Sequence, residues 1–312
     1  MTKIFVIILN FNGAHNTLEC LKSLEKLDIP KNVAIEPLVV DNSSTDDSVR
    51  EIKKEFPKIT LVGNQTNIGF TGGNNEGIRY SLKNGADFTI LLNNDTIVHP
   101  DLIKNLLNSF TRDTRDTLDT LLIGGAVPKI YFEKGYEFHK DSYKESERGK
   151  VIWYAGGQMD WDNLIGGNIG VDEVDRGQFN TRMETELATG CCFMLRADLL
   201  QKVGLFDDRY YLYYEDADLS ERIKRAGFKI IYEPKAILWH KVAESSGGSG
   251  SDLQDYYITR NRLLFGMTYA PIRTKLALFR ESFNLLRNGR KWQKRGVLDF
   301  YLRKFGRGSF PI

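Results

Sequence analysis

Short apolar segments alternate with amphipathic ones through the first 110 residues of this 312-residue chain. Four segments have the continuous hydrophobicity of strands buried inside a parallel sheet: residues 3–9, 34–40, 59–62 and 88–92. Helical patterns lie between them, at residues 17–27, about 45–56, and from the 67–75 segment to about 82. This alternation predicts an α/β fold, a Rossmann-like αβα sandwich with a mostly parallel, doubly wound sheet.

The pattern changes after about residue 111. A charged surface excursion is expected at residues 133–150 and a polar connection at 176–184. Further β-structure is expected at residues 121–127, 151–170, 189–195, 229–232 and 236–240. Helices are expected from about residue 100, at 197–203, after the acidic stretch near 216, and at 252–265. These elements extend the same layered domain.

Polar residues follow the predicted strands at the points where they end. They are Asn10, Asn12, Asp41, Asn93, Asn94 and Asp95. Ligands of such sheets bind at the carboxyl ends of the strands, so one crevice should collect these side chains. Asp41 suits hydrogen bonding to a base or a ribose, or turn and cap chemistry in the Asp-Asn-Ser-Ser segment. Asp95 suits a hard cation such as Mg²⁺ or Mn²⁺, or a plain turn before Pro100.

A glycine-rich segment at residues 67–75 contains Asn67, Gly69 and Asn74. As a loop that leads into a helix, it would offer backbone N–H groups to a phosphate. Its glycine spacing is not that of a dinucleotide fingerprint. The alternative is a tight turn that packs the helix on a strand.

Three carboxylates, Glu215, Asp216 and Asp218, follow a tyrosine-rich run at the start of a predicted helix. A carboxylate walled by aromatic rings can be desolvated and tuned as a general base. The alternative gives Asp216 the N-cap, Asp218 a first-turn role and Arg222 an i,i+4 pairing with Asp218.

His240 ends an apolar strand beside a Ser/Gly-rich stretch at residues 245–251, which we expect to be a flexible lid loop. This histidine is either a metal or diphosphate contact or a structural residue.

Composition is that of an ordinary globular protein, 41% hydrophobic and 27% charged. Residues 273–307 carry eleven Lys or Arg against two acids, with aromatic side chains interleaved. This basic tail suits an anionic membrane surface, with a solvated face or nucleic acid as alternatives. No apolar run reaches the roughly 20 residues of a membrane span, and three cysteines make no disulfide framework, so we expect a cytoplasmic protein with reduced thiols.

Taken in order, these segments resemble family 2 glycosyltransferases, in the rhamnosyltransferase-like branch. The resemblance covers residues 3–265 and rests on a set of short motifs: Asn10-Phe11-Asn12, Asp41-Asn42-Ser43-Ser44, Asn67-Ile68-Gly69-Phe70, Asn93-Asn94-Asp95, Gly190, Gly204-Leu205-Phe206-Asp207, Glu215-Asp216-x-Asp218, Trp239-His240 and Tyr256-Tyr257-x-x-Arg260-Asn261. The tail beyond about residue 270 lies outside it.

The resemblance implies a GT-A fold with a nucleotide-sugar-binding half at residues 1–110 and an acceptor-binding half at 111–243. Residues 244–312 would then form the lid loop and a helical basic extension. By position, the nucleotide and diphosphate contacts would be Asn10, Asn12, Asp41, Asn67, Gly69, Asn74, Asn93, Asn94 and Arg260. Asp95 and His240 would hold the metal, and Asp216 would be the base, supported by Glu215 and Asp218. The D-x-D element reads Asn-Asn-Asp here, so Asp95 is its one anionic residue.

The implied activity is inverting transfer of a sugar, with rhamnose as one candidate, from a dTDP- or UDP-sugar to a glycan or lipid-linked glycan. It would take place on the inner face of the cell membrane and would use Mg²⁺ or Mn²⁺. A sugar-phosphate nucleotidyltransferase is a rival, against which stands the lack of a triphosphate-binding signature after the first strand. A non-catalytic nucleotide-sugar or glycan-binding protein is another. No nucleic-acid partner is expected, and the sequence does not give the oligomeric state.

Overall fold

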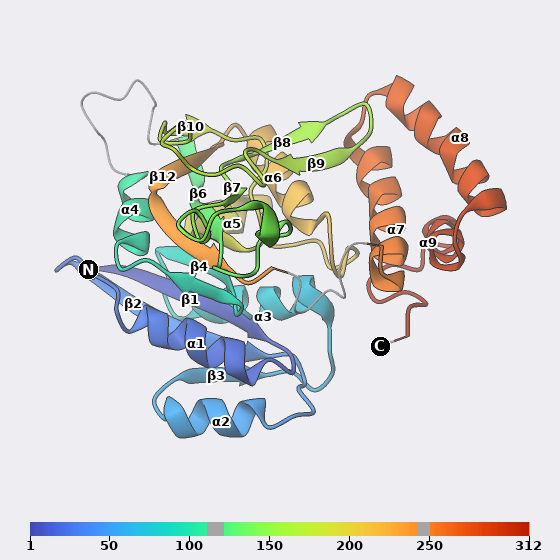
Figure 1. Ribbon diagram of the computed structural model, residues 1–312. Coiled ribbons are helices and arrows are strands. Elements are labelled where there is room, and N and C mark those ends of the chain that lie inside the picture. Colours follow the sequence, from blue (N-terminus) through green and yellow to red (C-terminus); the bar gives the residue numbers. More distant parts are fainter. Residues whose placement is uncertain (111–121, 243–249, 312) are drawn as a thin grey trace.

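The computed structural model describes residues 1–110, 122–242 and 250–311 (Figure 1). In this part of the chain, ten strands form one sheet, eight of them in the order β10-β12-β6-β11-β4-β1-β2-β3, with β5 paired to β12 and β7 to β6. The strands are β1 (Thr2–Asn10), β2 (Val33–Asp41), β3 (Thr60–Gly63), β4 (Phe88–Asn93), β5 (Thr96–Val98), β6 (Ile123–Phe132), β7 (Ile152–Tyr154), β10 (Met183–Glu184), β11 (Cys192–Arg196) and β12 (Lys229–His240).

The long strand pairings are parallel, as the sequence predicts. β1 runs parallel to both β2 and β4, β2 to β3, and β6 to β12. β11 is antiparallel to β4 and to β6 and joins the two parallel groups, while the remaining antiparallel pairings are short. A separate hairpin consists of β8 (Gly157–Asp160) and β9 (Ile165–Asn168).

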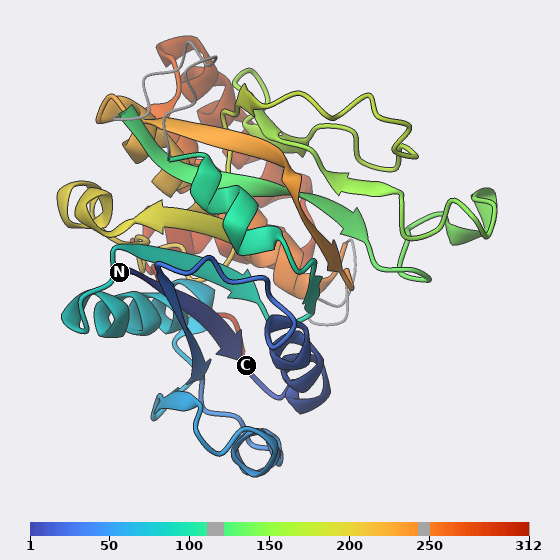
Figure 2. The same ribbon diagram turned by 90° about the vertical axis from the view of Figure 1, so that its left-hand side faces the viewer.

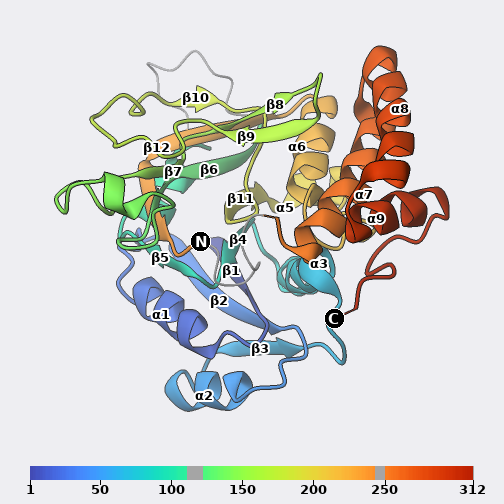
Figure 3. The same ribbon diagram turned by 45° about the vertical axis from the view of Figure 1, so that its right-hand side comes forward.

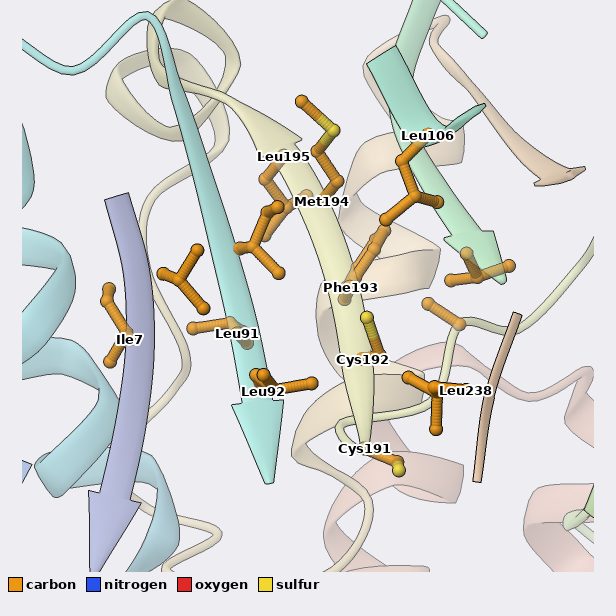
Figure 4. Packing of buried hydrophobic residues seen from close by; sticks show 14 of the residues in the cluster. Ile7, Leu91, Leu92, Leu106, Cys191, Cys192, Phe193, Met194, Leu195 and Leu238 are labelled. Carbon is orange, nitrogen blue, oxygen red and sulfur yellow. The ribbon is translucent and has the colours of Figure 1, made fainter. Parts of the chain in front are cut away.

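Helices cover both faces of this sheet. They are α1 (Ala14–Leu24), α2 (Ser48–Glu55), α3 (Gly69–Lys83), α4 (Leu102–Asn108), α5 (Ala197–Val203) and α6 (Glu215–Arg225), with a 3₁₀ turn at Lys140–Ser142. α1, α2 and α4 lie on one face, and α3, α5 and α6 on the other (Figures 2 and 3). Ile7 of β1, Leu91 of β4 and Phe193 of β11 are fully buried between these layers (Figure 4). The expected αβα sandwich is therefore present.

The glycine-rich segment is a helix rather than a loop, because α3 begins at Gly69. A Cβ on Gly77 would lie 2.4 Å from the Ile7 side chain, and one on Gly73 would lie 2.4 Å from that of Leu9. Real Cβ atoms do not approach so closely. These glycines let α3 pack directly on β1, which is the packing role of the alternative, although the segment is a helix start and not a tight turn.

Other boundaries also differ from expectation. β5 was not expected at all, and residues 229–240 form one strand with a register shift between Glu233 and Ile237. β6 extends to Phe132, while position 121 of the strand expected there lies outside the described residues. The cysteines are buried and unpaired, as expected.

The basic tail folds onto the domain as helices. α7 (Asp252–Tyr269), α8 (Ile272–Asn288) and α9 (Lys291–Tyr301) stand together at one end of the molecule (Figure 1). Val297 and Asp299 of α9 are fully buried against this group. No helix in the described ranges is long and apolar enough to span a bilayer. Most of the expected lid loop, residues 245–249 of 245–251, lies outside the described part of the chain.

Candidate active site

The ends of β1, β2 and β4 bring their polar residues together, as the sequence predicts. Asn10 pairs in register with Asp41, and Leu9 with Asn93. The buried Asp41 carboxylate accepts hydrogen bonds from Asn10 Nδ2 (2.9 Å), Ser44 Oγ (2.6 Å) and the Ser44 backbone N–H (3.0 Å). Asp41 therefore stabilises the turn after β2, at the carboxyl ends of the parallel strands.

Asn12, just after β1, stabilises the turn that follows β2. Its Oδ1 accepts a hydrogen bond from the Thr45 N–H (2.8 Å), and its own N–H donates to Ser44 Oγ (2.9 Å). The adjacent Phe11 exposes 42% of its surface at the end of β1. An exposed aromatic ring beside Asp41 can stack on a base. The sequence reasoning quoted this residue only as part of a motif; its signal is an aromatic residue between two asparagines at a strand end.

Asp95 and His240 meet because β5 pairs with the end of β12, which sets Thr96 opposite His240. His240 Nε2 lies 3.1 Å from Asp95 Oδ1, and both side chains are buried. Among the described residues, this ion-pair contact is the one interaction of Asp95 Oδ1, and His240 Nδ1 has no hydrogen-bond partner. Buried polar atoms without partners are rare, and a ligand that supplies the missing interaction explains them. Asn94 instead turns toward α1, where its Nδ2 donates to Thr17 Oγ1 (3.1 Å).

This pair fits a divalent cation that takes its other ligands from a substrate. A carboxylate oxygen and an imidazole nitrogen are suitable donors. Among the described residues, no group of three or more His, Cys, Asp or Glu side chains is arranged to hold a metal. Two protein ligands leave several positions for water and phosphate oxygens, as hard cations often require.

Asp216 lies in the first turn of α6 and is not its N-cap. That position belongs to Tyr214, which adopts a left-handed conformation with φ of 70°. Tyr211 and Tyr213 also have positive φ, at 67° and 68°, which is unfavourable for residues with bulky side chains. Asp216 Oδ1 accepts from the Ala217 N–H (2.8 Å) and Oδ2 from the Gly190 N–H (3.2 Å).

The residues of α7 hold this strained turn, and Arg260 is one of them. The Arg260 guanidinium is fully buried and donates to the carbonyl oxygens of Tyr210 (2.9 Å), Arg209 (3.2 Å) and Gly306 (2.7 Å). Its neighbour Asn261 donates to three carbonyls of the same turn. The expectation that Arg260 contacts a diphosphate is wrong for this structure, because its donors are used by the backbone and no solvent reaches it.

Glu215 and Asp218 are the other two carboxylates in the first turn of α6. Asp218 is buried and accepts hydrogen bonds from Arg222 Nε (2.8 Å) and Tyr269 OH (2.7 Å), so it ties α6 to α7, and the expected pairing with Arg222 is present. Glu215 Oε2 is buried and has no hydrogen-bond partner within the described part of the chain. Burial raises the pKa of Glu215 well above its ordinary range, and the Asp216 carboxylate raises it further. Burial also raises the pKa of Asp216, an effect that the N–H groups of Gly190 and Ala217 oppose.

A cavity of about 680 Å³ opens at Asp216. Its walls come from the β8–β9 hairpin, the start of α6, α7 and α8, and they include Trp153, Asn168, Thr189 and Tyr213. The Trp153 ring also packs edge-on against the His240 imidazole, with ring centroids 4.7 Å apart. One side chain thus connects the Asp95–His240 pair to the cavity. Trp153 was expected only as part of a β-segment, since nothing local in the sequence indicates this bridging position.

Three predicted contacts at the start of α3 have structural roles instead. The Asn67 side-chain oxygen accepts from Asn42 Nδ2 (2.9 Å) and the Gly69 N–H (2.9 Å), and the Thr71 N–H donates to the Tyr211 carbonyl (3.2 Å). Gly69 has a φ of +80°, and the Tyr211 ring packs against it so closely that a Cβ there would clash. The buried Asn74 side chain donates to the Phe70 carbonyl. Because protein acceptors use these N–H groups, this helix start is not a free phosphate site.

Comparisons with known proteins show the family of this chain. A model described as Glycosyl transferase family 2 matches residues 5–204. An N-acetylglucosaminyl-diphospho-decaprenol L-rhamnosyltransferase from Mycobacterium tuberculosis is 25% identical over 237 residues, which cover 72% of each chain. A dolichyl N-acetyl-alpha-D-glucosaminyl phosphate 3-beta-D-2,3-diacetamido-2,3-dideoxy-beta-D-glucuronosyltransferase from Methanococcus voltae is 25% identical over 237 residues, covering 73% of this chain and 69% of its own.

Two solved structures share the fold. The mannosyltransferase PcManGT from Pyrobaculum calidifontis, in complex with GDP-Man and Mn²⁺, superposes with a TM-score of 0.54 and 15% identity, covering 99% of this chain and 76% of its own. GalNAc-T7 with UDP, GalNAc and Mn²⁺ superposes with a TM-score of 0.61 and 17% identity, covering 100% of this chain and 59% of its own. Both alignments include the C-terminal helices, and the fold is that of GT-A glycosyltransferases.

Proposed function

Because the chain belongs to glycosyl transferase family 2, we propose that it transfers a sugar from a nucleoside-diphosphate sugar to a hydroxyl of a glycan or lipid-linked glycan, with inversion at the anomeric carbon. The observation that carries the proposal is the position of Asp216. Its carboxylate lines the cavity, is fixed by two backbone N–H groups, and is linked through Trp153 to the Asp95–His240 pair.

In this reaction Asp216 is the general base. The acceptor oxygen attacks the anomeric carbon, its proton passes to the Asp216 carboxylate, and the bond to the nucleoside diphosphate breaks. Burial and the Asp216 carboxylate raise the pKa of Glu215 well above its ordinary range. Asp216, whose carboxylate accepts hydrogen bonds from two backbone N–H groups, is therefore the member of the pair that gives up its proton first. Asp218 maintains the position of α6 through Arg222 and Tyr269.

The strand-end crevice holds the donor. Asp41, positioned by Asn10, binds the base or ribose, and the exposed Phe11 ring stacks on the base. Asp95 and His240 would hold a divalent cation, Mg²⁺ or Mn²⁺, which would neutralise charge on the departing diphosphate. Asp95 is the one carboxylate of the pair, so the cation is held tightly only with a diphosphate in place. We take dTDP- and UDP-sugars as the donor candidates, with rhamnose one candidate sugar.

The proposed acceptor and membrane location rest on the names of the relatives and on the exposed surface of α8. Two relatives carry a prenyl-linked acceptor in their names. The outward face of α8 exposes Ile272, Leu276, Phe279 and Phe283, at the spacing of one helical stripe. The exposed Arg273, Arg280 and Arg287 accompany this stripe. Apolar side chains flanked by cations suit an anionic membrane surface, so the proposed site of action is the inner face of the cell membrane.

A thermal-shift panel tests the donor half of the proposal. UDP, dTDP, GDP and CDP are each added with and without Mn²⁺, and a ligand at ~100 times its dissociation constant adds about 2.7 kcal/mol of stability. We expect UDP or dTDP to raise the melting temperature, and Mn²⁺ to increase that shift while producing little shift alone. The absence of a shift with every diphosphate would contradict a nucleotide-sugar site.

A further inference from the structure

The Asp216 cavity has mainly apolar walls where α7, α8 and the β8–β9 hairpin enclose it. These walls contain Ile165, Ile258, Leu263, Leu278 and Leu285. A sugar needs hydrogen-bond partners for its hydroxyl groups, and hydrocarbon walls cannot supply them. The polar lining near Asp216 suits a sugar, whereas this part of the cavity suits a hydrocarbon.

Two of the wall residues are exposed although they are large and apolar. Ile165 exposes 56% of its surface and Ile258 36%. Single exposed apolar residues are common on protein surfaces. These two come from a hairpin and a helix about 90 residues apart in the chain, yet they line the same cavity. Their convergence indicates that a ligand covers them.

α8 connects the cavity to the surface stripe. One face of the helix lines the cavity with Leu278, Glu281, Ser282 and Leu285, and another carries the exposed stripe that begins at Ile272. An apolar chain that leaves the cavity thus meets the same helix that is proposed to lie on the membrane. Figure 1 places α8 at the edge of the molecule, beyond α7.

An ion pair in the cavity wall completes the arrangement. The Arg262 guanidinium donates to Glu281 Oε1 (2.7 Å) and to the Asn163 carbonyl (2.8 Å). The cavity thus presents, within one volume, the Asp216 carboxylate, the Arg262–Glu281 ion pair and hydrocarbon walls. An amphipathic ligand with a hydroxyl, a phosphate and an apolar chain matches these three features.

We propose that this cavity is the binding site for the prenyl phosphate part of a lipid-linked acceptor. The first isoprene units lie against Ile165 and Ile258, the phosphate lies near Arg262, and the rest of the lipid continues along α8 into the bilayer. This inference rests on the proposed function for the identity of the reaction, but it concerns binding that is measurable without any transfer.

The first test is binding of farnesyl phosphate, followed by the intrinsic fluorescence of the tryptophans, of which Trp153 lines the cavity. The double variant Ile165→Asn, Ile258→Asn should raise the dissociation constant about tenfold, since it removes two apolar contacts. The matched control is Ile29→Asn, at a position 49% exposed and outside the cavity, and it should bind as the wild type does. Equal affinity in all three proteins would overturn the proposal, as would full competition by inorganic phosphate.

The second test is transfer, with a prenyl-diphosphate-linked acceptor sugar and the same sugar on a short water-soluble aglycone. The double variant should raise KM about tenfold for the prenyl-linked acceptor and leave KM for the short acceptor and for the donor unchanged. An equal rise for both acceptors would overturn the lipid site. The wild type could transfer sugar to neither acceptor and still bind farnesyl phosphate more tightly than the double variant does. In that case the proposed function fails and the lipid site stands.

Discussion

The side-chain amide of Asn261 donates a hydrogen bond of 2.8 Å to the carbonyl oxygen of Tyr213. The same amide also donates to the carbonyls of Tyr210 (2.9 Å) and Leu212 (2.7 Å). The turn that it holds contains three tyrosines with positive φ and leads directly into Asp216. α7 therefore sets the position of the proposed base from outside the sheet.

Asn261→Ser should weaken this support. It leaves the carbonyl oxygens of Leu212 and Tyr213 without this donor, whereas the Tyr210 carbonyl keeps that of Arg260, and we expect a loss of about 2–4 kcal/mol in the free energy of unfolding. The turnover number should fall tenfold or more while donor binding stays unchanged, because the strand-end crevice is not altered. Asn288→Ser, at an exposed position on α8, is the control. Wild-type turnover in a destabilised Asn261→Ser protein would show that α7 does not position Asp216.

Asp95→Asn should remove the metal-dependent part of donor binding. The variant keeps the size of the side chain but lacks the one carboxylate that lies beside His240. In calorimetry with UDP or dTDP, the wild type should bind more tightly when Mn²⁺ is added, and the variant should bind equally with and without it. Asp28→Asn, at an exposed position, serves as the control. Metal-enhanced binding that persists in Asp95→Asn would place the cation elsewhere.

Glu215→Gln should stabilise the protein at neutral pH. Burial raises the folded-state pKa of Glu215, so its contribution to stability is complete below the unfolded-state pKa of about 4.3 and is lost as the pH rises toward the folded-state value. The advantage of the variant should be absent at pH 4 and grow above it, by about 1.4 kcal/mol per unit of pKa difference. Urea unfolding between pH 4 and 8 measures it, with Glu25→Gln as the exposed control. A pH-independent difference would contradict the raised pKa.

Phe283→Ser should weaken membrane association. Phe283 and Phe138 are both 54% exposed, but only Phe283 belongs to the apolar stripe of α8. Burying a phenylalanine side chain is worth roughly 1.5–3 kcal/mol, so the partition coefficient on vesicles with anionic lipid should fall about tenfold or more. Phe138→Ser should sediment with vesicles as the wild type does. An equal loss of vesicle binding in both variants would contradict membrane association through the apolar stripe of α8.

Hydrophobic patterning was enough to predict the sheet and the meeting of Asn10, Asp41 and Asn93 at its edge, because parallel strands end on one side. It did not predict β5, since Thr96–Val98 is too short to show a period. Without β5, the contact between Asp95 and His240 had no geometric basis and rested on resemblance. The structure now supplies that basis.

The sequence predicted phosphate contacts at the glycine-rich segment and at Arg260, and these two errors have one physical cause. Glycine permits close approach to a phosphate and to a strand alike, so the residues of α3 could not be assigned from composition. Arginine likewise binds diphosphates and backbone carbonyls with the same donors, and the carbonyls around Arg260 come from segments about 50 residues away on either side. A choice between such partners depends on tertiary contacts that no local sequence pattern contains.

The most direct test of the account is sugar transfer by Asp216→Asn, measured together with donor binding. The variant keeps the shape of the side chain but cannot accept the acceptor proton, so the turnover number should fall by at least a hundredfold. The dissociation constant of the nucleoside diphosphate with Mn²⁺ should match that of the wild type, because Asp216 lies on the acceptor side. Undiminished transfer by Asp216→Asn would contradict the assignment of Asp216 as the base.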